Sequence, residues 1–258
     1  PDQKRWFNMR VTPLTAVSPN LVVVFHIDIT ERRLAEERAQ QKKEQLTQRI
    51  EKARQIHQVL LPPEKLELET LAAAVFYQPA EDLGGDFLNF HQVGDKLVFY
   101  IVDVSGHGLD GAMLNLLVKE KLDNYLTIWE QEQKEYYGYD WLLESEASNK
   151  HLCPRRIIAQ VHDLYTRKEF PADYFLCIEV GVIDLDKNKL IHSNAGVHIA
   201  PGYLSPEGQL IPLTAAGAPI SEVVPFKKEE LTERKTDLEA GGKLFFTTDG
   251  LIEIRGST

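Results

Sequence analysis

The chain has 258 residues, of which 29 are Lys or Arg and 39 are Asp or Glu, so its net charge is −10. This acidic balance argues against a nucleic-acid partner, because phosphate backbones attract basic surfaces. No apolar run approaches the roughly 20 residues of a membrane-spanning helix. The two cysteines lack metal-ligand spacing and are most simply reduced thiols of a soluble, cytoplasmic protein.

Two strand-like segments open the chain, at residues 6–11 and 21–29, around a turn that contains Pro and Ser. Alone they are too short to bury a core. They end in Asp-Ile-Thr-Glu-Arg-Arg (28–33), which resembles the exit of a PAS sensor domain, with Thr30 as a candidate N-cap. We expect residues 1–30 to be the C-terminal part of such a domain. The alternative is an ordinary junction between a strand and a helix.

Residues 31–61 are rich in Glu, Lys, Arg and Gln and contain no Gly or Pro, which predicts one long helix that Pro62-Pro63 ends. Its C-terminal half has residues at the four- and three-residue steps of a coiled-coil seam: Leu46, Ile50, Ala53, His57 and Leu60. We expect residues 31–63 to form a coiled-coil-like linker and the chain to form a homodimer through helix 31–61. The alternative is a solvated helix that lies on its own domain.

The remainder alternates strands and helices. Residues 136–152 are polar and aromatic and suggest a loop or an insertion. The other patterns predict a strand at 71–77, a hairpin about Gly94-Asp95, helices at 109–122 and 155–165, a hairpin formed by 178–185 and 189–194, and a buried strand at 244–248.

The first hairpin places two aspartates together. If Gly94 and Asp95 are its two loop residues, cross-strand partners have numbers that sum to 189, as Asp86 and Asp103 do. Directly opposed residues have Cβ atoms about 4.5–5.5 Å apart, where two carboxylates repel each other. A divalent cation bound through oxygen would compensate. The alternative is that the numerical match is an accident and one aspartate lies in a loop.

A third acid strengthens the metal hypothesis. Asp249 follows the apolar run 244–248, as Asp103 ends the run that begins at Leu97. Carboxylates clustered at strand ends are suited to Mg²⁺ or Mn²⁺, and two such ions activate a water and clamp a phosphoryl group.

Four motifs occur in the order and rough spacing of the SpoIIE-type, metal-dependent serine/threonine phosphatases: Gly84-Gly85-Asp86, Asp103-Val104-Ser105-Gly106-His107-Gly108, Asn194-Ala195-Gly196 and Thr248-Asp249-Gly250. This resemblance to the bacterial branch of the 2C-type phosphatases covers residues 53–258. It implies an α+β fold, an α-β-β-α sandwich of two mostly antiparallel sheets flanked by helices, in residues 64–258. It also implies two Mn²⁺ or Mg²⁺ ions, with Asp86, Asp103, Asp249 and the backbone carbonyl of Val104 as ligands.

His107 is the candidate catalytic residue, as a proton donor to the leaving serine oxygen. The alternative is that it packs over the metal loop and fixes its shape. The sequence also departs from the family pattern: Val197 separates Gly196 from His198, and Cys177 replaces a threonine. The family has a further aspartate downstream, whereas this sequence ends nine residues after Asp249, so we expect that acid and the last strands to be absent.

The resemblance implies a phosphoserine/phosphothreonine protein phosphatase of bacterial signalling, controlled by the PAS sensor. Its substrate would be a phosphorylated anti-sigma-factor antagonist. One alternative is a catalytically incomplete module that binds the same partner without hydrolysis, which the absent fourth aspartate favours. A small-molecule phosphohydrolase is a weaker alternative, because no nucleotide-binding loop is recognisable.

Overall fold

A computed structural model describes residues 4–13, 22–79, 83–106, 108–136, 152–168, 170 and 174–252. The chain divides into two compact units, residues 1–53 and 54–258. This division falls inside helix α1 (Thr30–Leu60). The predicted boundaries after residues 30 and 63 stay predictions.

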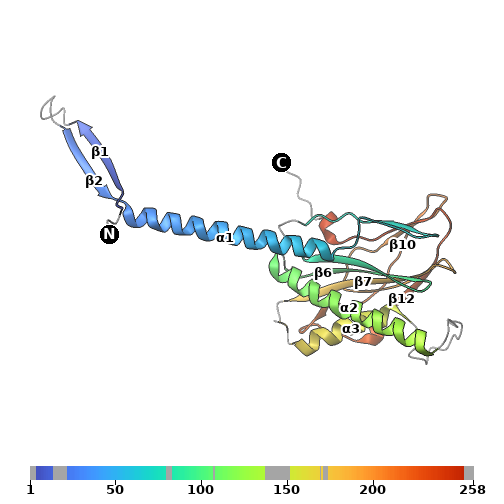
Figure 1. Cartoon of the computed structure of the whole chain (residues 1–258). Coiled ribbons are helices and arrows are strands. Elements are labelled where there is room, and N and C mark those ends of the chain that lie inside the picture. Colours follow the sequence, from blue (N-terminus) through green and yellow to red (C-terminus); the bar gives the residue numbers. More distant parts are fainter. Residues whose placement is uncertain are drawn as a thin grey trace. The chain divides into compact units, whose positions relative to one another are not determined.

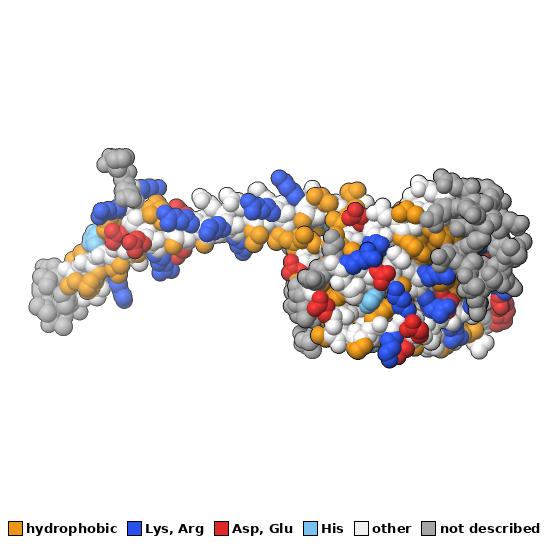
Figure 2. Space-filling model, turned by 90° about the horizontal axis from the view of Figure 1, so that it is seen from below, with side chains coloured by type: hydrophobic (Ala, Val, Ile, Leu, Met, Phe, Trp, Pro, Cys, Tyr) orange, Lys and Arg blue, Asp and Glu red, His pale blue; other side chains and the backbone are white. Residues whose placement is uncertain are grey.

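The first unit begins with a two-stranded hairpin in which β1 (Phe7–Pro13) pairs antiparallel with β2 (Val22–Asp28). Its large hydrophobic side chains are exposed, and Figure 2 shows hydrophobic side chains along it. A two-stranded ribbon has too little surface to bury a core by itself. The expectation that this segment lacks its own core is therefore confirmed, while its origin in a PAS domain stays a prediction.

The N-cap of helix α1 lies one residue before the predicted one. The amide of Arg33 donates to the carbonyl of Ile29 at 2.9 Å, so Ile29 is at the N-cap and Thr30 is the first helical residue. The hydroxyl of Thr30 instead accepts a hydrogen bond from the amide of Trp6 at 2.9 Å. Asp28 accepts the amide hydrogen of Thr30 through its carboxylate, at 2.9 Å. The prediction of Thr30 as N-cap is therefore wrong, because its hydroxyl is hydrogen-bonded to the residue before β1 and not to the helix.

The other end of α1 belongs to the second unit. His57, which the heptad pattern placed in a coiled-coil seam, is buried, with its ring 6.2 Å from the rings of both Tyr77 and Phe87. Its place in a seam is therefore wrong. Leu46 is exposed, so the remaining part of the seam stays a prediction.

A six-stranded antiparallel sheet forms the centre of the second unit. Its main path runs in the order β12-β8-β7-β6-β5, and β11 pairs with β7. The strands are β5 (Asp86–Val93), β6 (Lys96–Val104), β7 (Phe175–Asp184), β8 (Lys189–Ala195), β11 (Ile220–Ser221) and β12 (Glu233–Asp237). Both predicted hairpins are confirmed as the pairs β5–β6 and β7–β8.

Helices α2 (Leu109–Tyr136) and α3 (Pro154–Lys168) cover one face of this sheet (Figure 1). Both are longer than predicted, and α2 continues well past residue 122. Proline is tolerated at the first turn of α3, where no intrahelical partner is needed for an amide. The main core lies between helices and sheet and includes Val98, Tyr100, Val102, Leu122, Ile157 and Val161.

Two small sheets lie over the other face. One contains β3 (Lys65–Glu67) and β4 (Ala72–Ala74), and the other contains β10 (Leu210–Pro212), β9 (Gly202–Leu204) and β13 (Lys243–Phe245). Their apolar side chains pack against Leu97 and Phe99 of β6. The α+β class with antiparallel sheets is confirmed, and the complete α-β-β-α layering stays a prediction.

Strands β4 and β13 are shorter than the predicted strands 71–77 and 244–248. The prediction of a buried strand through residue 248 is wrong, since Phe245 is 52% exposed and β13 ends there. None of the helices among the described residues has the length and apolarity needed to cross a membrane.

Candidate active site

The first hairpin brings Asp86 and Asp103 directly opposite each other, as predicted from their residue numbers, which sum to 189. Gly94 and Asp95 are its two loop residues, and Gly94 has a φ of 58°, which primed hairpin turns require at this position. The two carboxyl groups therefore start from adjacent strands on the same face of the sheet.

On the neighbouring strand β7, Cys177 is the cross-strand partner of Asp103. Burial raises the pKa of the Cys177 thiol to about 12, and the negative charges of Asp103 and Asp249 add to this effect. The thiol is therefore neutral at physiological pH.

Asp249 begins the short 3-10 helix η2 (Asp249–Leu251), and the residues on either side of it approach Asp86. The hydroxyl of Thr248 donates a hydrogen bond to Oδ2 of Asp86 at 2.6 Å. A Cβ atom added at Gly250 would lie 3.9 Å from the same oxygen. Asp103 and Asp249 also line one small pocket. Asp103 thus shares a pocket with Asp249, and Asp86 is bonded to the residue before Asp249, while a joint site of the three aspartates stays a prediction.

Gly85 fixes the turn that precedes Asp86. Its carbonyl accepts hydrogen bonds from the amide of Val104 at 3.1 Å and from the side-chain amide of Asn115 at 2.7 Å. A Cβ atom here would lie 2.5 Å from the carbonyl oxygen of Gly106 and 2.7 Å from that of Val104. Only glycine permits this close approach of main chains. The carbonyl of Val104, a predicted metal ligand, therefore lies beside this turn.

Tyr77 supports the same turn from the segment after β4. Its hydroxyl donates to the backbone carbonyl of Asp86 at 3.3 Å. Burial raises the pKa of Tyr77 to about 12, and the charge of Asp86 contributes in the same direction. The phenol therefore stays protonated and able to donate.

Sequence reasoning missed four polar residues that hold this site: Tyr77, Asn115, Asn194 and Thr248. Asn115 carried a detectable signal, because it is a polar residue inside a helix that is apolar on one face. Thr248 and Asn194 belong to the family motifs, yet the motifs do not reveal their partners. His107 lies outside the described residues, so its predicted catalytic role stays a prediction.

The chemistry of the site fits a hard divalent cation. Its predicted side-chain ligands are carboxylates, and Mg²⁺ is usually held by only one or two of these together with waters and substrate phosphate oxygens. Among the described residues, no three His, Cys, Asp or Glu side chains are grouped in a way that would hold a metal ion. Asp86, Asp103 and Asp249 offer the oxygen ligands that Mg²⁺ and Mn²⁺ prefer, but their positions in this structure do not form a three-ligand cluster, so their role as metal ligands stays a prediction.

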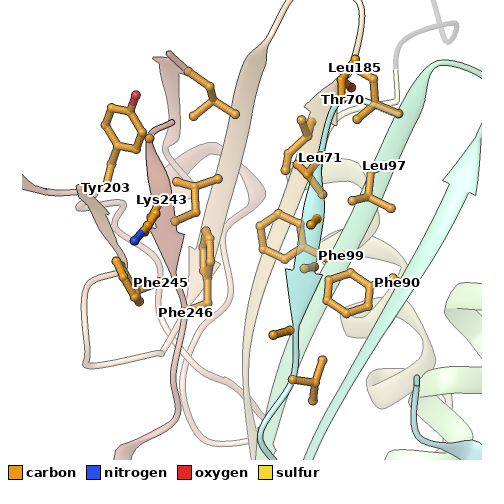
Figure 3. Close-up of a pocket in the computed structure, with 18 of the residues that line it drawn as sticks. Thr70, Leu71, Phe90, Leu97, Phe99, Leu185, Tyr203, Lys243, Phe245 and Phe246 are labelled. Carbon is orange, nitrogen blue, oxygen red and sulfur yellow. The ribbon is translucent and has the colours of Figure 1, made fainter. Parts of the chain in front are cut away.

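A larger cavity of about 810 Å³ lies elsewhere, between the central sheet and the two small sheets. Figure 3 shows its aromatic lining, in which the rings of Phe99 and Phe246 have centroids 4.5 Å apart. None of the three aspartates lines it. Size alone would select this cavity, but none of the predicted site residues lines it, so the candidate chemistry is assigned to the aspartates.

Comparison with protein families identifies the chain. The family model described as Stage II sporulation protein E (SpoIIE) matches residues 94–258, which is more than half of the sequence. The chain belongs to the SpoIIE family. This is a family of PP2C-type serine/threonine phosphatases, and it is metal-dependent.

Solved structures share this fold. The SiaA-PP2C domain of Pseudomonas aeruginosa is 16% identical, with a TM-score of 0.62 over 84% of this chain and 77% of that one. The RsbU and RsbW domains of Rv1364c from Mycobacterium tuberculosis are 20% identical, with a TM-score of 0.50 over 70% of this chain and 43% of that one. RsbX in complex with magnesium is 14% identical, with a TM-score of 0.51 over 70% and 74%.

Proposed function

We propose that this SpoIIE-family chain hydrolyses phosphoserine and phosphothreonine in a protein substrate, with Mn²⁺ or Mg²⁺ bound through Asp86, Asp103, Asp249 and the carbonyl of Val104. The observation that carries this proposal is the register of Asp86 against Asp103, with Asp249 brought to them by Thr248. When bound, two such ions supply an activated water and neutralise phosphoryl charge.

The chain's own residues then have separate tasks. The three carboxylates hold the cations, and the Gly85 turn positions Asp86 through Asn115 and the amide of Val104. His107 is proposed to donate a proton to the serine oxygen as the phosphorus–oxygen bond breaks. Its loss would cost at most about the 10²–10⁴-fold that is typical of one acid-base group.

Replacing Asp103 by Asn tests the proposal, because it removes the charge and keeps the size of the side chain. We expect activity on a phosphoserine peptide with Mn²⁺ to fall by about 10²–10³-fold or more, as for the loss of one transition-state stabiliser. Asp186→Asn, at an exposed turn, is the matched control and should retain activity. Full wild-type activity in excess chelator would exclude the mechanism.

The substrate and the regulation are further parts of this proposal. The family resemblance supports a phosphorylated anti-sigma-factor antagonist as the substrate, in the cytoplasm. Residues 1–30 are proposed as the end of a PAS sensor and residues 31–63 as the linker that transmits its signal. A homodimer through helix 31–61 would couple two chains. The exposed apolar side chains of the hairpin support additional contacts there.

A catalytically incomplete binding module remains the second candidate. The absence of a three-ligand cluster among the described residues favours it. It predicts that the chain binds the phosphorylated partner without releasing phosphate at any Mn²⁺ concentration. Phosphate release and partner binding, measured on the same preparation, distinguish the two candidates.

A further inference from the structure

The loop after β8 is fixed by the side chain of Asn194. This side chain is buried, and its Nδ2 donates to the carbonyl of Val197 at 2.8 Å. Its Oδ1 accepts the amide hydrogen of Val197, also at 2.8 Å. One side chain therefore satisfies both backbone groups of a residue three positions later, which closes the turn.

Packing at Gly196 fixes the loop against the sheet. Gly196 has a φ of 85°, and its amide donates to the carbonyl of Gly217 at 2.9 Å. A Cβ atom here would lie 2.7 Å from Cα of Pro219 and 2.9 Å from Sγ of Cys177. Cys177 is the cross-strand partner of Asp103, so the loop packs against a residue that is paired with one of the aspartates.

This fixed loop includes His198, which lines the same small pocket as two of the aspartates. Residues 196–199 line the small pocket that also contains Asp103, Asp249, Ile101 and Thr248. His198 itself is exposed to solvent. Among the described residues lining this pocket, it has the one side chain with a nitrogen donor, and the hydroxyl of Thr248 already donates to Asp86.

On the basis of the proposed phosphatase function, we propose that His198 is a substrate-binding residue that donates an imidazole N–H to a phosphoryl oxygen. A phosphoryl group that enters a site of carboxylates needs donors aimed at its oxygens. A neutral imidazole carries one N–H, so this contact requires no change of protonation. His198 makes and breaks no covalent bond.

A pair of substitutions tests the contact. His198→Gln retains an N–H donor and His198→Leu removes it, while His26→Gln, at an exposed position of β2, is the control. With Mn²⁺, we expect His198→Leu to lower kcat/KM by about 10–100-fold, the range expected for one hydrogen bond to a charged group. The loss should be equal for p-nitrophenyl phosphate and a phosphoserine peptide, because both present the same phosphoryl oxygens. His198→Gln should retain most of the activity.

Binding of inorganic phosphate in the presence of Mg²⁺, measured by calorimetry, tests the contact without turnover. His198→Leu should weaken it by a similar factor and leave the affinity for Mn²⁺ unchanged. A loss confined to the phosphoserine peptide would assign His198 to the leaving group and overturn the proposal. Unchanged phosphate affinity in His198→Leu would also overturn it. If the wild type binds phosphate but releases none from either substrate, the phosphatase proposal fails while the contact is still measured.

Discussion

Thr248 joins the C-terminal part of the site to the central sheet. Its hydroxyl donates to Oδ2 of Asp86 at 2.6 Å, although the two residues are 162 positions apart in the chain. A hydrogen bond to a carboxylate is stronger than one between neutral groups. This contact therefore both orients Asp86 and keeps Asp249 beside it.

Thr248→Val removes the hydroxyl and keeps the shape of the side chain. A hydrogen bond to a charged group contributes about 1.5–3 kcal/mol, so we expect the Mn²⁺ concentration for half-maximal activity to rise by about tenfold or more. Titration of Mn²⁺ against phosphate release measures this. Thr127→Val, on the exposed side of α2, is the control and should titrate like the wild type. An unchanged midpoint for Thr248→Val would show that Asp86 is held by other contacts.

The residues that could be predicted are those placed by local rules. The register of Asp86 and Asp103 follows from the length of one turn, because side chains alternate along paired strands. Asn115 stood out as a polar residue in a partly apolar helix, but its partner could not be predicted, since it is a backbone carbonyl 30 residues away. The buried pair of Glu179 and His192 was missed for a similar reason, because it joins two strands through side chains that face the interior.

At the scale of elements, the last turns of α1 lie against the strand that begins with Asp86. His57 contacts Tyr77 and Phe87, and Tyr77 donates to the carbonyl of Asp86. The end of the predicted linker is thus in physical contact with groups that position a candidate metal ligand.

Burial lowers the pKa of His57 below its ordinary value of 6.5. The unfolded chain then binds a proton more readily than the folded chain as the pH falls through about 6.5. This histidine therefore reduces stability as the pH falls below that value and has no such effect above it.

We expect the melting temperature of wild type to fall more between pH 7.5 and pH 5.5 than that of His57→Phe, which cannot titrate. Thermal unfolding of both proteins at the two pH values is the measurement. His26→Gln, at an exposed position, should behave as the wild type. An equal fall in the melting temperatures of wild type and His57→Phe would show that protonation of His57 does not affect the stability of the folded chain.

Elements with local signals were predicted well, and elements that depend on distant partners were not. Turn residues and apolar alternation predicted both hairpins of the central sheet. In contrast, β13 extends only as far as its three-residue pairing with β9. The strand predicted from the apolar run 244–248 is therefore too long at its C-terminal end. Strand length is determined by the available pairing partner, which lies elsewhere in the sequence.

At the scale of the whole molecule, large apolar side chains are exposed in both units, among them Phe76, Met113 and Val223 of the second. Figure 2 shows Lys and Arg side chains interspersed with Asp and Glu on one face of the second unit, which is typical of a solvated surface. The hairpin of the first unit exposes several large apolar side chains, including Phe7, Met9, Phe25 and Ile27. Such surface favours association with another protein surface.

The proposed dimer is tested by placing charge in the remaining seam. Leu46 is exposed and Ile50 lies four residues later on α1, so Leu46→Asp with Ile50→Asp adds two charges on one face of the helix. We expect light scattering to give a concentration-dependent dimer for wild type and a monomer for the double variant. A seam with so few apolar positions gives a weak dimer, so the measurement requires high protein concentration.

The control is Gln41→Asp with Gln48→Asp, which adds the same two charges at exposed positions on the other face of the helix. Phosphate release from both variants separates assembly from regulation. A ligand or a partner shifts activity only if one helix arrangement suits the active site better than another. If the seam variant is monomeric and its activity differs from that of wild type, α1 couples assembly to catalysis. A wild-type monomer at high concentration, or a seam variant that keeps its dimer, would show that the helix acts only as a tether.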